Sequence, residues 1–171
     1  MADVQHVVVM GVSGSGKTTV ARLVADRLQR PFLEADDLHP AANVAKMAAG
    51  TPLTDVDRAP WLRSLRDWLA AQTSAGEPSV LTCSALKVAY RDVLREGGPV
   101  VFVHLNLTAE ILAQRMGQRT GHFMPPTLLA SQLATLEPLL PTEAGFTLDA
   151  TGSADELSAR IADRVLATSG V

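Results

Sequence analysis

Two patterns of apolar residues alternate along the chain. Short apolar runs predict buried strands, at residues 7–10, 31–33, 79–83, 100–105 and 146–149. Stretches in which apolar residues recur every three or four positions predict amphipathic helices, at residues 18–28, 41–49, 61–69 and onward to near Gly76, 87–96, 108–119, 126–136 and 153–165. Parallel strands need crossover connections, which are usually helices. The alternation therefore predicts a three-layer α/β fold, with a five-stranded parallel sheet between two layers of helices.

Composition agrees with a single domain over residues 1–171 and argues against several classes of protein. Of the 171 residues, 47% are hydrophobic and 19% charged, which is enough for one core and short for two. No apolar run is long enough to span a membrane and no leader pattern begins the chain, so we expect a cytoplasmic protein without a membrane partner. A single cysteine argues against a zinc fold, and the net charge of −3 argues against a nucleic-acid partner.

The segment after the first predicted strand matches a phosphate-binding loop. It reads G-x-x-x-x-G-K-[ST] between a strand and a helix, the context that this motif requires. Its glycines let backbone N–H groups approach phosphate oxygens, which the positive end of the following helix also attracts. Lys17 is predicted to reach the β- and γ-phosphates, and the Thr18 hydroxyl to bind Mg²⁺. The predicted nucleotide-binding residues here are Gly11, Val12, Ser13, Gly14, Ser15, Gly16, Lys17, Thr18 and Thr19.

Acidic side chains follow the second predicted strand, at the sheet edge where ligands gather. Alternation along a strand would put Glu34 and Asp36 on the same side. Asp36 is the candidate general base for an acceptor hydroxyl, and Glu34 the candidate carboxylate that holds Mg²⁺ through water. The alternative is a solvated acidic turn before the helix that begins near Pro40. Strand 79–83 ends without an aspartate and no Asn-Lys-x-Asp segment occurs, which argues against a motor ATPase or a GTPase.

Cationic side chains are candidates for the acceptor side. Lys87 and Arg91 are spaced i, i+4, so they share one face of a predicted helix. An arginine fork binds carboxylate or phosphate through two parallel hydrogen bonds, so Arg58 or Arg91 could anchor an acidic group of the acceptor. For each of these side chains an ordinary surface ion pair is the alternative.

A segment hinged by glycine and proline predicts a mobile lid at about residues 116–131. Arg115 and Arg119, again spaced i, i+4, lie at its start. Arginines delivered by a closing lid would stabilise the negative charge of phosphoryl transfer and exclude water, so Arg119 is a candidate catalytic residue. His122 is predicted either to touch the acceptor or to lie on the polar surface.

Further segments form a pattern together with the phosphate loop. They are Asp36-Asp37-Leu38-His39-Pro40, Asn43 with Lys46-Met47, Gly50-Thr51-Pro52-Leu53, Asp57-Arg58-x-Pro60-Trp61-Leu62, Cys83-Ser84-Ala85-Leu86-Lys87 with Tyr90-Arg91-Asp92, and Gly121-His122-Phe123-Met124-Pro125 with Ser131-Gln132 and Thr135-Leu136-Glu137. With these segments the chain resembles the bacterial-type gluconokinases of the P-loop small-molecule kinase group, from about Val7 to the final predicted helix.

The resemblance implies transfer of the γ-phosphate of ATP to the 6-hydroxyl of D-gluconate, with Mg²⁺ required. It also implies a P-loop NTPase fold similar to that of shikimate and nucleoside monophosphate kinases, and a homodimer, which is common in the family. It suggests Arg115 and Arg119 on the phosphates, and around the sugar acid Asp36, His39, Arg58, Ser84, Lys87, Arg91 and His122. Glu34 stands where we expect aspartate in many relatives, and its longer side chain could still reach the waters of Mg²⁺.

Two other functions stay open. The chain could be a kinase for another small anionic acceptor, shikimate-like or a nucleotide, built on the same scaffold. It could also be a non-catalytic ATP-binding sensor that uses its lid as a switch. Lys17, Asp36 and Arg119 argue against the sensor, because a protein that only binds ATP has no need of a base.

Overall fold

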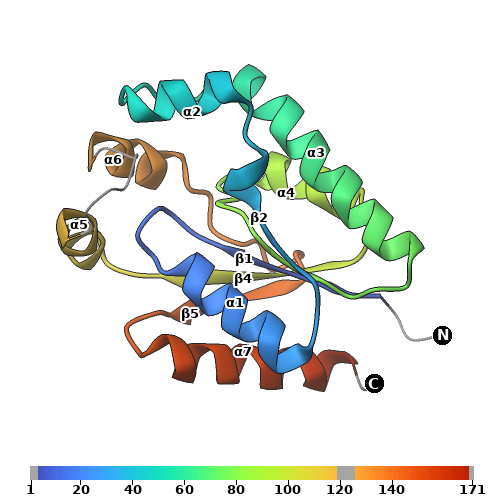
Figure 1. The fold of residues 1–171 in the computed structure, drawn as a ribbon. Helices are drawn as coiled ribbons and strands as arrows, with labels where there is room; N and C mark the ends of the chain where they lie inside the picture. Colours follow the sequence, from blue (N-terminus) through green and yellow to red (C-terminus); the bar gives the residue numbers. More distant parts are fainter. Residues whose placement is uncertain (1–3, 119–125, 170–171) are drawn as a thin grey trace.

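The computed structural model describes residues 4–118 and 126–169, and a five-stranded parallel sheet forms its centre (Figure 1). The strand order in space is β2-β3-β1-β4-β5, and every pairing is parallel. The strands are β1 (His6–Met10), β2 (Phe32–Glu34), β3 (Val80–Thr82), β4 (Val100–Asn106) and β5 (Gly145–Asp149). The predicted α/β sheet is confirmed, with small shifts at the strand ends.

Helices cover both faces of this sheet. In Figure 1, α1 and α7 lie together on one face, and α3 and α4 lie together on the other. The helices are α1 (Lys17–Leu28), α2 (Ala41–Ala48), α3 (Asp55–Ser74), α4 (Val88–Arg95), α5 (Ala109–Gln118), α6 (Pro126–Thr135) and α7 (Ala154–Ser169), with a 3₁₀ helix η1 (Ala35–Leu38) after β2. No described helix is long and apolar enough to cross a membrane.

The apolar run of β1 explains its central position. All five residues of β1 are buried, because β3 and β4 flank it at the sides and helices cover it above and below. The chain leaves β1 for β2 on one side of the sheet and later reaches β4 on the other, so the order reverses at β1. In parallel sheets the crevice at such a reversal, at the carboxyl ends of the strands, is where ligands bind. Helices α5 and α6 lie beyond this edge (Figure 1).

Helix α3 begins earlier than the apolar spacing predicts. The apolar pattern starts at Trp61, whereas the helix starts at Asp55, after the N-cap residue Thr54. The Thr54 hydroxyl accepts a hydrogen bond from the Asp57 N–H, and the Asp57 carboxylate accepts one from the Thr54 N–H. This reciprocal cap stabilises a first turn of mostly polar residues. The correction matters for the site, because Arg58 lies in that first turn.

Candidate active site

The phosphate loop connects β1 to α1 and is held in a tight curve. A Cβ on Gly11 would lie 3.0 Å from the Leu105 carbonyl oxygen, so only glycine fits there without a shift. Gly16 caps α1 with φ of 88°, in the left-handed region that glycine favours. Lys17 Nζ donates to the Val12 carbonyl oxygen at 3.0 Å. The Ser15 hydroxyl is buried and has no hydrogen-bond partner among the described residues, which fits a loop shaped to receive phosphate oxygens.

The residues predicted to hold Mg²⁺ lie side by side. The Thr18 hydroxyl donates to a Glu34 carboxylate oxygen at 2.5 Å. The described residues hold no cluster of three or more His, Cys, Asp or Glu side chains that could bind a metal by themselves. Mg²⁺ in kinases usually takes only one or two ligands from the protein and the others from phosphates and water. A hydroxyl and a carboxylate beside a phosphate loop fit that requirement.

Asp36 reaches the same site from a different element than expected. Strand β2 ends at Glu34, and Asp36 lies on η1, so strand alternation does not place it. Nonetheless, Glu34 and Asp36 line one pocket together with Ser13 and Lys17. The Asp36 side chain is about half exposed, at 54%. The structure therefore brings both predicted carboxylates beside the phosphate loop.

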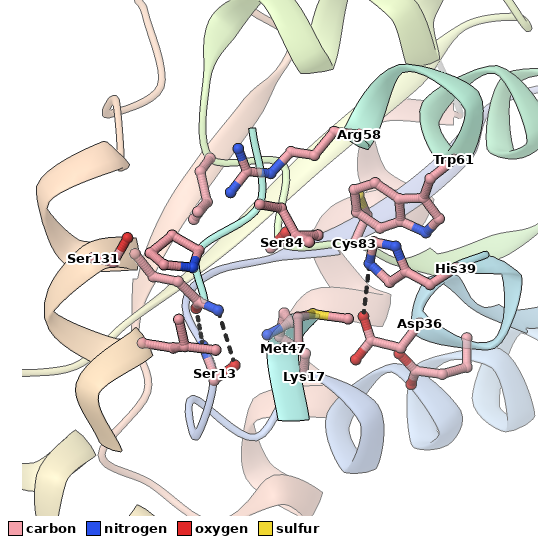
Figure 2. A pocket seen from close by; sticks show the side chains of 16 residues that line it. Ser13, Lys17, Asp36, His39, Met47, Arg58, Trp61, Cys83, Ser84 and Ser131 are labelled. Carbon is pink, nitrogen blue, oxygen red and sulfur yellow. Dashed lines mark hydrogen bonds and ion pairs between the residues drawn. The ribbon is translucent and has the colours of Figure 1, made fainter. Parts of the chain in front are cut away.

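A larger cavity extends from the phosphate loop toward α2, α3 and α6 (Figure 2). Its lining includes seven of the residues predicted from the sequence, namely Ser13, Lys17, Glu34, Asp36, His39, Arg58 and Ser84. It also includes apolar and polar residues to which no role was assigned, among them Met47, Leu53, Trp61, Leu128, Ser131 and Gln132. Cys83 is in the wall as well, where burial raises the pKa of its thiol to about 12, so the thiol is not nucleophilic near neutral pH.

His39 lies flat against Trp61 in the wall of this cavity. The ring centroids are 4.1 Å apart and the planes differ by 13°. Only 4% of the His39 side chain is exposed, and its Nε2 lies 3.9 Å from an Asp36 carboxylate oxygen. Burial, and then the positive charge of Arg58, lower the pKa of His39 from 6.5 to about 4. The ring is therefore neutral at neutral pH.

Arg58 and Lys87 share the carboxylate of Asp55 at one end of the cavity. Arg58 Nη1 lies 3.0 Å from the Tyr90 hydroxyl and 3.7 Å from Asp55, and Lys87 Nζ lies 3.4 Å from Asp55. Tyr90 in turn donates to Asp55, and this hydrogen bond is the largest of the interactions that lower the Asp55 pKa. Arg58 lines the cavity and its side chain is 15% exposed, whereas Lys87 is not among the lining residues. Arg58 can therefore contact a molecule in the cavity directly, whereas Lys87 lies outside the cavity wall.

Arg91 does not reach the cavity, which corrects the prediction that it anchors the acceptor. Its side chain is fully buried and forms a two-pronged ion pair with Glu143, at 2.7 and 3.0 Å. The guanidinium also donates to the carbonyl oxygens of Ala85 and Pro138. Burial raises the Glu143 pKa, but the hydrogen bonds from Arg91 and the Leu140 N–H, together with the positive charges of Arg91 and Arg95, outweigh burial and hold the pKa below its usual value. Arg91 braces the loop that carries Ser84.

The arginines and histidine of the expected lid are only partly described. Arg115 Nη1 would lie 3.8 Å from a Cβ built on Gly16, so its guanidinium is over the phosphate loop. Arg119 and His122 lie outside the described residues. The second half of the expected lid includes the start of α6, which carries Leu128, Ser131 and Gln132 to the cavity.

Gln132 is the contact that sequence reasoning missed. The Ser13 N–H donates to the Gln132 Oε1 at 2.7 Å, and the Gln132 Nε2 donates to the Ser13 hydroxyl at 3.2 Å. This amide therefore joins α6 to the phosphate loop across 119 positions of sequence. Its presence in a segment that carries the family resemblance was the one available signal, because a lone glutamine on a helix indicates no chemistry by itself.

Comparisons with a family model, with curated proteins and with solved structures each find proteins similar to this chain. A family model described as an AAA domain matches residues 7–139. The gluconokinase of Gluconobacter oxydans is 59% identical over 134 residues, which cover 78% of this chain and 75% of that protein. A sugar kinase from a Janibacter species has a TM-score of 0.90 at 55% identity, over 94% of each chain. A gluconokinase from Sinorhizobium meliloti has a TM-score of 0.81 at 42% identity, over 98% of this chain and 99% of that one.

Proposed function

The chain belongs to the gluconokinase family, and we propose that it transfers the γ-phosphoryl group of ATP to the 6-hydroxyl of D-gluconate. One observation carries the proposal beyond family membership. A phosphate loop, a carboxylate and a partly buried arginine line one continuous cavity, through Lys17, Asp36 and Arg58. If ATP binds at the Lys17 end and the acidic group of the acceptor binds at the Arg58 end, a hydroxyl group of the acceptor lies near the Asp36 carboxylate between them.

At the nucleotide end, the loop residues 11–19 hold the phosphates. Lys17 leaves its contact with Val12 and turns to the β- and γ-phosphates, while Arg115 approaches from α5. Thr18 and, through water, Glu34 would hold Mg²⁺, which would neutralise charge on the phosphates. Arg119 remains a predicted partner of the transferred group.

At the acceptor end, Asp36 accepts the proton of the 6-hydroxyl group while the oxygen of that hydroxyl group forms the new bond to phosphorus. The bond between the γ-phosphorus and the bridging oxygen breaks at the same time, and ADP leaves with its electron pair. Arg58 binds the gluconate carboxylate with Lys87 nearby, and His39 and Ser84 hold hydroxyl groups. His122 remains a predicted contact. The apolar side chains of Met47, Trp61 and Leu128 exclude water that would otherwise hydrolyse ATP.

A coupled ADP-release assay with ATP and Mg²⁺ tests the proposal. The acceptors are gluconate, shikimate, glucose and a nucleoside monophosphate, and mass spectrometry identifies the product. We expect turnover with gluconate and a product heavier by one phosphoryl group. Turnover only with another acceptor would support the kinase activity but overturn the assignment of gluconate as the substrate. Tight ATP binding without transfer to any acceptor would instead support an ATP-binding sensor.

A homodimer and a cytoplasmic location stay predictions. Light scattering coupled to size-exclusion chromatography would measure the mass of the particle in solution, with and without nucleotide. A mass near 18.1 kDa would contradict the homodimer, because it is the mass of one chain.

A further inference from the structure

Asn43 lies behind His39, outside the cavity lining, and only 4% of the residue is exposed. Its Nδ2 lies 2.9 Å from the Asp57 backbone carbonyl oxygen and 3.3 Å from His39 Nδ1. A carbonyl oxygen can only accept a hydrogen bond, so the amide must turn its NH₂ group toward Asp57. The same NH₂ group therefore faces His39 Nδ1. The remaining N–H of the amide has an imidazole nitrogen as its acceptor.

We propose that Asn43 is a positioning residue that holds His39 in the tautomer with its proton on Nε2, the nitrogen that faces Asp36. A neutral imidazole has one donor nitrogen and one acceptor nitrogen. Because Asn43 donates to Nδ1, Nδ1 must be the acceptor and Nε2 must carry the proton. Stacking on Trp61 holds the ring in the plane that directs Nε2 toward Asp36 (Figure 2). The backbone of α3 thus determines, through Asp57 and Asn43, which hydrogen bond His39 offers.

The consequence lies in the 3.9 Å between Nε2 and the Asp36 carboxylate. This separation is too long for a direct hydrogen bond, and an oxygen atom placed beside both groups could contact each. His39 offers a donor and Asp36 offers an acceptor, so the pair suits a hydroxyl group, which accepts from one and donates to the other. This part of the inference rests on the proposed function, in which that hydroxyl belongs to the sugar acid. The charged groups facing His39 are Asp36 on η1 and Arg58 on α3.

Nitrogen-15 NMR of the histidine rings tests the tautomer in the unmodified protein without any measurement of activity. We expect His39 to show a protonated Nε2 and an unprotonated Nδ1 at neutral pH. Assignment uses the His39→Gln variant, whose spectrum lacks this ring. A protonated Nδ1 in the unmodified protein would overturn the proposal whatever the enzyme phosphorylates.

Variants then connect the tautomer to the acceptor. Asn43→Ala removes the donor, and we expect a mixture of tautomers together with a roughly tenfold lower kcat/KM for gluconate, the effect of about one neutral hydrogen bond. The KM for ATP should stay unchanged. Lys46→Met is the matched control, because it breaks the 2.8 Å Lys46–Asp57 ion pair between the same two helices and does not touch His39. An equal loss in both variants would assign Asn43 to packing of α2 on α3 and overturn its role.

Substitution of His39 itself separates the two nitrogens. The amide of His39→Gln can place an N–H near the position of Nε2, whereas the shorter His39→Asn places one near Nδ1. We expect the glutamine variant to keep more activity with gluconate, and Asn43→Ala to cost less in that background than in the unmodified protein. Greater activity of the asparagine variant would overturn the assignment. If Asn43→Ala fails to fold, the two His39 variants and the NMR measurement of the tautomer still decide whether His39 carries its proton on Nε2.

Discussion

The two ends of the cavity are built in different ways. The phosphate end comes mainly from one contiguous segment, residues 11–19, which the turn between β1 and α1 shapes. The acceptor end is assembled from three separate parts of the chain, namely the stretch from η1 through α2 to the start of α3, the loop before α4, and α6. A contiguous motif carries its geometry with it, whereas an assembled pocket depends on how the elements pack.

Two arginines show what this difference means. Arg58 and Arg91 were equal candidates for the acceptor acid, since both follow from charge and spacing alone. The structure puts Arg58 in the cavity wall, and it buries Arg91 against Glu143. The partner that distinguishes them is Glu143, which lies 52 positions from Arg91 in a segment without a functional signal. Charge predicts an anion partner, and packing decides whether that partner is a substrate or the protein.

The largest expected effect is therefore on stability, in Arg91→Met. Removing the guanidinium leaves Glu143 buried with Arg95 as its remaining cation, so we expect the free energy of unfolding to fall by about 3–5 kcal/mol. Urea denaturation measures it. Arg66→Met, which breaks a more exposed pair with Glu96, is the control and should cost less than about 1 kcal/mol. Unchanged stability together with a raised KM for gluconate would return Arg91 to the acceptor end.

The second effect is on the chemical step, in Asp36→Asn. An amide cannot take the hydroxyl proton, so we expect kcat to fall by a factor on the order of 100 or more while ATP binds as before. Asp37→Asn is the matched control, because Asp37 is the next residue on η1 and does not line the cavity. Steady-state kinetics and ATP titration separate the two quantities. Equal kcat values for the two variants would remove Asp36 as the base.

Much of the fold could be predicted because its signals are local. The apolar runs of β1 and β4 and the phosphate loop are each visible within a few residues. The start of α3 was missed because its first turn is mostly polar, and the Thr54 and Asp57 cap that stabilises it contains no apolar signal. Gln132 was missed for a different reason. Its partner Ser13 is brought to it only by the packing of α6 over the loop.

The third prediction concerns Arg58, which among the described residues is the cation that lines the acceptor end. Arg58→Ala removes a charged partner from a mostly buried position, so we expect KM for gluconate to rise roughly tenfold or more with little change in KM for ATP. Lys87→Met should have a smaller effect, because Lys87 is more exposed and does not line the cavity. Initial-rate kinetics with each substrate varied in turn measures the two KM values separately. An equal rise in both KM values for Arg58→Ala would move Arg58 to nucleotide binding or to folding.

The smallest expected effect is that of pH on the acceptor end. A histidine with the ordinary pKa of 6.5 would change charge close to neutrality, but burial, followed by the charge of Arg58, lowers the His39 pKa to about 4. We therefore expect no inflection from His39 in the pH dependence of KM for gluconate near pH 6.5. An inflection at that pH that disappears in His39→Gln would show that the ring is charged in the working enzyme.

The same lowered pKa has a consequence for stability, whose sign follows from proton binding. Below pH 6.5 the unfolded chain binds a proton at His39 that the folded chain refuses until about pH 4. The contribution of His39 to stability is therefore complete above pH 6.5 and declines as the pH falls from 6.5 toward 4. Urea denaturation across this range should give a shallower decline for His39→Gln than for the unmodified protein. An equal decline in the two proteins would mean that His39 is solvated. The description of His39 as a stacked, neutral ring, on which the acceptor end depends, would then be wrong.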